Sequence, residues 1–132
     1  MKNLLLVLVS FFLIHAATAQ KTASKVEVLY FKANLSCCQA KACNNLESTI
    51  KEIVEENFSS QEVIFKTVAI ADEANASLVA KYNAKSQTVV MVNTKKNKSL
   101  DVSDIVRQYL RDGDKTVFSK SLVEKAKTTI KL

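Results

Sequence analysis

Apolar positions along this chain follow two spacings, one typical of buried strands and one typical of helices packed on a sheet. Nearly continuous apolar, β-branched runs at residues 26–31, 63–70 and 88–92 predict strands covered on both sides. The short segment 98–100 follows the polar turn 93–97, and its lysine suits an edge strand. The pattern therefore predicts a sheet of about four strands.

Helical spacing fills the stretches between and after these strands. Apolar residues recur every three or four positions within residues 46–58, 78–82, 102–110 and 118–130. Asp72 is a predicted N-cap for the second helix, and Asp114 or Thr116 for the last. Gly113 falls where a helix end needs a positive φ. The order predicts an α/β three-layer sandwich with a largely parallel central sheet, helices on its faces and an extra C-terminal helix.

The first 19 residues have the pattern of a secretory signal peptide. Lys2 gives a positive start, residues 4–14 are apolar, and Ala17 and Ala19 stand at −3 and −1 from Gln20. This run is short for a membrane span, and no later segment could serve as one. We expect a periplasmic or secreted protein with a short polar segment at 20–25, one domain at 26–132, and no membrane contact after cleavage.

Composition narrows the function classes. The 132 residues are 48% hydrophobic and 24% charged, which is ordinary for a globular domain. The formal charge of +6 comes from scattered lysines, densest at residues 95–98, without the arginine and aromatic stripe typical of nucleic-acid binding. The single histidine, His15, lies in the leader, so Cys–His and Ser–His–Asp catalysis are excluded from the domain. One glycine cannot build a phosphate-binding loop.

All three cysteines lie within seven residues, at Cys37, Cys38 and Cys43. They stand where the first strand gives way to a helix, and the free N–H groups of a helix N-terminus stabilise a thiolate. Three cysteines cannot all pair within one exported chain, so one pair and one odd thiol are expected. We take all three as candidate catalytic residues of thiol–disulfide exchange: Cys37 or Cys38 attacks and Cys43 resolves. No cofactor is needed.

The chain resembles thioredoxin-like domains and, more narrowly, the ArsF family, also called the nitrophenyl compound nitroreductase subunit family. The similarity rests on Leu29-Tyr30-Phe31 followed by Cys37, on Cys43-Asn44-Asn45-Leu46-Glu47, on Asn57-Phe58, on Tyr82 and Ser86 before the third strand, and on the Phe118 helix. It implies redox partners that carry protein thiols or disulfides.

Two features depart from the thioredoxin pattern. In thioredoxin-like oxidoreductases and in the ArsF family, two residues generally lie between the paired cysteines, whereas four residues separate Cys38 from Cys43 and five separate Cys37 from Cys43. The chain also has no proline, and the place of the thioredoxin cis-proline falls near Gln87-Thr88. The ArsF family also tends to lack that proline. A continuous helix would hold the cysteines too far apart for a disulfide, so pairing requires a loop folded back over the helix.

Two alternatives to redox catalysis remain. One is a stable disulfide in a binding or structural domain. The other is a soft thiolate site made by Cys37, Cys38 and Cys43 for copper, zinc or, as the resemblance suggests, arsenic.

Overall fold

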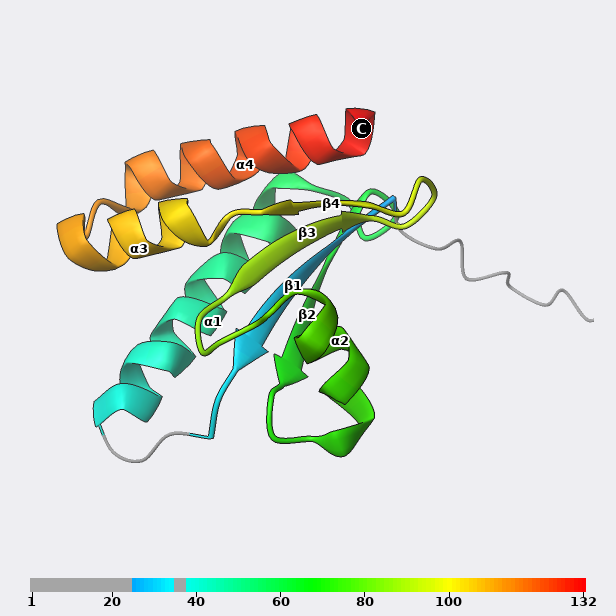
Figure 1. Ribbon diagram of the computed structural model, residues 1–132. Coiled ribbons are helices and arrows are strands. Elements are labelled where there is room, and N and C mark those ends of the chain that lie inside the picture. Colours follow the sequence, from blue (N-terminus) through cyan, green and yellow to red (C-terminus); the bar gives the residue numbers. More distant parts are fainter. Residues whose placement is uncertain (1–24, 35–37) are drawn as a thin grey trace, which may run out of the picture.

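The computed structural model describes residues 25–34 and 38–132 and shows a sheet with helices on both faces (Figure 1). The expected leader at 1–19, most of the polar segment after it, and Cys37 lie outside the described residues. The strands are β1 (Val26–Lys32), β2 (Val63–Ala69), β3 (Val89–Asn93) and β4 (Lys98–Asp101). The helices are α1 (Cys38–Asn57), the 3-10 turn η1 (Glu73–Asn75), α2 (Ala76–Lys81), α3 (Ser103–Asp112) and α4 (Lys115–Lys131).

The sheet has the order β2-β1-β3-β4, so β1 and β3 are its central strands. β1 pairs parallel with β2, antiparallel with β3, and β3 pairs antiparallel with β4. The predicted four-stranded α/β architecture is confirmed, but the expectation of a largely parallel sheet is wrong for β3. η1 and α2 together rise only about 15 Å, less than the roughly 23 Å of a seven-residue strand. The chain therefore enters β3 at the end of the sheet where β2 finishes, instead of crossing back to the end where β2 begins. This makes β3 antiparallel to β1.

Alternate residues of β1 supply two hydrophobic layers. Val26, Val28 and Tyr30 face a large core shared with α1, α3 and α4, whereas Leu29 and Phe31 face a smaller core under α2. Figure 1 shows this division, with α2 alone on one face of the sheet. Every residue of the two cores lies between positions 26 and 130. The described part of the chain thus contains a complete three-layer domain.

Local chemistry explains where the helices start and stop. Asp114 accepts hydrogen bonds from the backbone N–H groups of Thr116 and Val117 at 3.0 Å each, so it is the N-cap of α4. Gly113 has a φ of 71° at the C-cap of α3, as the sequence predicts. Asp72 caps η1 through a 3.0 Å bond from Ala74 N. The rings of Tyr109 and Phe118 stack with their centroids 4.4 Å apart, which packs α3 against α4.

Helix α1 begins earlier than the hydrophobic pattern indicates. Its apolar stripe starts at Leu46, yet the helix already begins at Cys38. Cys43 therefore lies more than one turn inside the helix. Among the described residues, no helix is long and apolar enough to cross a bilayer.

Candidate functional site

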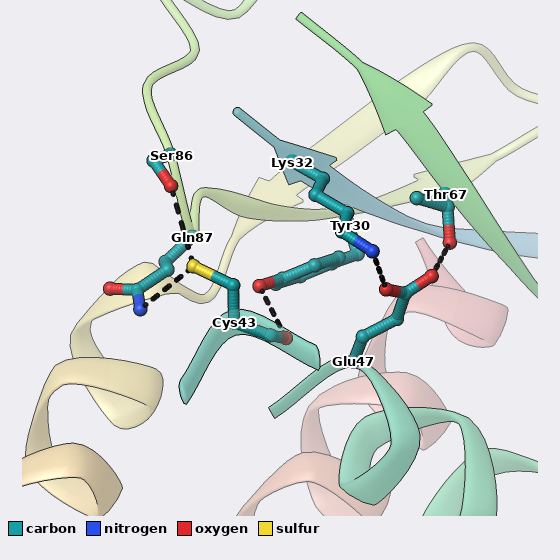
Figure 2. A network of polar contacts seen from close by, with 7 residues as sticks. All are labelled: Tyr30, Lys32, Cys43, Glu47, Thr67, Ser86 and Gln87. Atoms are coloured by element: carbon teal, nitrogen blue, oxygen red, sulfur yellow. Dashed lines mark hydrogen bonds and ion pairs between the residues drawn. The ribbon is translucent and has the colours of Figure 1, made fainter. Parts of the chain in front are cut away.

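The side chain of Cys43 lies between helix α1 and the loop that leads into β3 (Figure 2). It is buried, with 1% of its surface exposed. Its sulfur receives a hydrogen bond from Nε2 of Gln87 at 3.5 Å and lies 3.8 Å from Oγ of Ser86. Cys43 forms no disulfide with any other described residue. The thiol is thus enclosed and has polar neighbours.

The loop that holds these neighbours is fixed to the end of β1. Gln87 N donates to Phe31 O and Phe31 N donates to Thr88 O, both at 2.9 Å. Gln87 has a φ of 69°, in the left-handed region that non-glycine residues seldom occupy. No peptide bond of the described residues is cis. The place where the resemblance would put a cis-proline therefore holds a left-handed glutamine whose amide side chain contacts the thiol.

Tyr30 closes the site from the sheet side. Its hydroxyl donates to the backbone oxygen of Cys43 at 3.1 Å, and its side chain is fully buried. Burial raises the pKa of Tyr30 far above its usual value. The neighbouring Cys43 and the charge of Glu47 raise it further. The phenol therefore stays protonated and can donate a hydrogen bond at any physiological pH.

One turn after Cys43, Glu47 joins the helix to the two parallel strands. Its carboxylate accepts a 2.7 Å hydrogen bond from Lys32 on β1 and a 2.6 Å hydrogen bond from Thr67 on β2. Burial would raise the pKa of Glu47, but these two hydrogen bonds and the charge of Lys32 hold it below its ordinary value. Glu47 is therefore ionised at neutral pH and fixes the rotation of α1 that turns Cys43 toward Gln87.

The helix also sets the separation between Cys38 and Cys43. Both belong to α1, five residues apart. In an α-helix such residues have Cα atoms about 8.7 Å apart. Disulfides need Cα atoms within about 6.8 Å. With its first turn intact, α1 keeps Cys38 from bonding to Cys43.

The structure describes the three predicted cysteines to different extents. Cys43 is buried beside Gln87 and Ser86, Cys38 is the first residue of α1, and Cys37 lies outside the described residues. No group of three His, Cys, Asp or Glu side chains among the described residues could hold a metal ion. A site made of all three cysteines includes Cys37 and stays a prediction.

Comparison with solved structures supports the fold. The structure described as "human ERp44 zinc-bound form" matches with a TM-score of 0.52 and 13% sequence identity. ERp44 is a thioredoxin-fold protein. The fold is thioredoxin-like. The match covers 83% of this chain but only 27% of that one, so this chain spans about a quarter of its neighbour's length.

Other comparisons add little to this assignment. A structure titled only as that of a malarial protein matches 67% of this chain and 97% of its own, with 20% identity and a TM-score of 0.41. No protein-family model and no curated protein matches the sequence.

Sequence patterns pointed to only part of this thioredoxin-like site. Tyr30 has the spacing of a core residue, and it is one, but its hydroxyl also reaches the cysteine helix. The partnership of Lys32, Thr67 and Glu47 was not predicted, because they come from three separate elements. The spacing of Glu47, four residues after Cys43, was the one local indication that both lie on the same side of the helix.

Proposed function

We propose that this thioredoxin-like domain carries out thiol–disulfide exchange with a partner protein, and that Cys43 is its buried resolving cysteine. The observation that carries the proposal is the buried Cys43 thiol, whose sulfur receives a hydrogen bond from Gln87 and lies beside the Ser86 hydroxyl. The hydroxyl of Tyr30 holds the backbone of the same residue. In thiol–disulfide exchange a thiolate attacks a disulfide sulfur, and polar groups beside the sulfur can support that step.

The exchange takes place in two steps. A thiolate at Cys37 or Cys38 attacks one sulfur of the partner's disulfide, forms a mixed disulfide and releases the partner's other sulfur as a thiolate. The Cys43 thiolate then attacks the first cysteine's sulfur, and the partner's remaining sulfur leaves. The domain gives up two electrons and gains a disulfide, while the partner becomes a dithiol. The reverse sequence oxidises a partner dithiol.

We infer Cys37 as the partner of Cys43 because Cys38 would need the first turn of α1 to unwind. Cys37 lies outside the described residues, so its pairing with Cys43 is part of the proposal. Cys38 would then be the odd thiol.

Insulin reduction by the wild type and by three single Cys→Ser variants tests this proposal. We expect Cys37→Ser and Cys43→Ser to lose activity and Cys38→Ser, their matched control, to keep most of it. Equal background rates for all four proteins would exclude redox catalysis. A redox potential below about −300 mV would then indicate the alternative, a stable structural disulfide.

Two further parts of the proposal concern place and ligands. The leader at residues 1–19 supports export, and N-terminal sequencing of the mature protein should begin at Gln20 if cleavage occurs there. The resemblance to the ArsF family and the zinc-bound form of ERp44 make a metal or metalloid the secondary candidate. Metal analysis of reduced protein, with Cys43→Ser as the control, tests that candidate.

A further inference from the structure

The fold gathers lysines that lie far apart in the sequence at one end of the sheet, opposite the cysteine site. Lys25 precedes β1, Lys95 and Lys96 lie in the turn after β3, Lys98 begins β4, and Lys131 ends α4. We call these five residues the lysine end. Figure 1 shows that the β3–β4 turn, the start of β1 and the end of α4 meet there.

Hydrogen bonds hold these segments together. Thr94 N donates to Lys25 O at 3.0 Å, and the Lys96 ammonium donates to Lys131 O at 3.2 Å. The buried side chain of Asn93 donates to Thr129 O at 3.0 Å and accepts from the backbone N–H groups of Lys95 and Lys96. The lysines therefore stand on a fixed framework and not on a loose tail.

The charges at this end are not neutralised by the domain. All five side chains are exposed, and within the described part of the chain none of them forms an ion pair. The nearby Glu62 carboxylate accepts a hydrogen bond from Ser59 at 3.1 Å. Elsewhere, Lys32, Lys66 and Lys115 each lie against a glutamate, while Lys41, Lys81 and Lys85 are exposed without an ion pair but come from separate parts of the fold. A cluster of unpaired lysines is electrostatically complementary to an anionic surface.

We propose that the lysine end docks on the anionic phospholipid headgroups of a membrane. Charge complementarity argues for this occupant, because the five ammonium groups are exposed and form no ion pair within the described part of the chain. The lysines also lack the arginines and interleaved aromatic residues typical of nucleic-acid sites. The proposal therefore replaces the expectation that the mature chain has no membrane contact. The cysteine site at the opposite end then faces away from the membrane. This inference does not depend on the proposed redox chemistry.

Vesicle co-sedimentation of the chain from Gln20 onward tests the proposal, because this chain retains both cores and lacks the apolar leader. The probes are phosphatidylcholine vesicles with and without about one third phosphatidylglycerol. We expect binding to the anionic vesicles only, and loss of binding in about 1 M salt, where the Debye length is about 3 Å. Equal binding to both vesicle types, or to neither, would overturn the proposal.

Charge reversal at the lysine end should weaken binding to anionic vesicles at least about 100-fold in the triple variant K95E/K96E/K98E. The matched control is K41E/K81E/K85E, which makes the same change in net charge at exposed lysines of α1, α2 and the loop before β3. We expect the control to retain most of the affinity, and circular dichroism checks that both variants fold. An equal loss in both would show that net charge acts and not this surface. Tighter binding to a short duplex DNA at the same salt would assign the surface to nucleic acid instead.

Discussion

The two ends of the central sheet use polar side chains in opposite ways. At the cysteine end, Tyr30, Glu47 and Gln87 are at least partly buried and each has a named hydrogen-bond partner. At the lysine end the charged groups are exposed, and backbone hydrogen bonds together with the buried side chain of Asn93 hold their segments in place. Buried polar groups cost free energy when a partner is lost, whereas exposed charges act mainly through long-range fields. Substitutions at the first end should therefore change stability and reactivity, and those at the second end binding alone.

The largest effect is expected at Cys43. If Cys43 resolves mixed disulfides, Cys43→Ser should accumulate covalent complexes with partner proteins in the compartment where the chain resides, and reductant should release them. Non-reducing electrophoresis followed by mass spectrometry measures the complexes. The control variant also carries Cys37→Ser and Cys38→Ser and should form none. If the control variant formed covalent complexes, or if Cys43→Ser formed none, the cysteine end would not be the reactive end of the domain.

Tyr30 should give the largest change in stability. Tyr30→Ala removes a fully buried ring and should lower the free energy of unfolding by about 3–5 kcal/mol. Tyr30→Phe keeps the ring and its 6.4 Å contact with Phe65 but loses the hydrogen bond to Cys43 O, at a cost of about 1 kcal/mol. Urea denaturation at pH 7 measures both. A Tyr30→Phe variant as stable as the wild type would show that the hydroxyl contributes nothing beyond the ring.

Glu47 should give a smaller effect that depends on pH. Because its pKa is lower in the folded than in the unfolded state, its ionised form stabilises the fold above the unfolded value of about 4.3. Glu47→Gln should therefore cost about 0.5–1 kcal/mol at pH 7, a modest figure because the pair with Lys32 is partly exposed. The difference from wild type should fade as the pH drops through the lower folded pKa. If the difference in unfolding free energy between wild type and Glu47→Gln stays constant down to pH 3, the substitution acts through packing and not through the charge of Glu47.

The smallest change in stability is expected at the lysine end. K95E/K96E/K98E should alter the free energy of unfolding by less than about 0.5 kcal/mol, since these side chains are exposed and the buried Asn93 that orders the turn is kept. Thermal unfolding at low and high salt measures this. A loss above about 2 kcal/mol would mean that the lysines support the fold directly, and the comparison of the two ends would fail.

Local patterns in the sequence were sufficient for most of the fold. Strands, helices, the Asp114 cap and the Gly113 helix end were all predicted, because each depends on residues within a few positions of each other. The orientation of β3 was not, because it depends on how far the short η1–α2 segment can reach across the sheet. The sequence predicted that the first helix runs from Cys43 or slightly earlier, and α1 begins at Cys38, because a helix start without an apolar stripe leaves little local signal.

The candidate site was predictable only in part. The clustering of cysteines at a strand-to-helix junction indicated where to look, and the missing proline directed attention to Gln87. The bonds from Gln87 to Cys43 and from Lys32 and Thr67 to Glu47 span 15 to 44 residues of sequence. Only tertiary packing brings such residues together. The lysine end illustrates the same point, since Lys25, Lys96 and Lys131 look scattered until the sheet and α4 are assembled.

Disulfide mapping of the oxidised protein tests the central claim most directly. Trypsin should cut after Lys41, which separates a peptide of residues 33–41, with Cys37 and Cys38, from a peptide of residues 42–51, with Cys43. After free thiols are alkylated, the account predicts that these two peptides are joined by one disulfide and that fragmentation assigns it to Cys37 and Cys43. Recovery of the 42–51 peptide with Cys43 alkylated, under conditions that oxidise the other cysteines, would contradict a resolving role for Cys43.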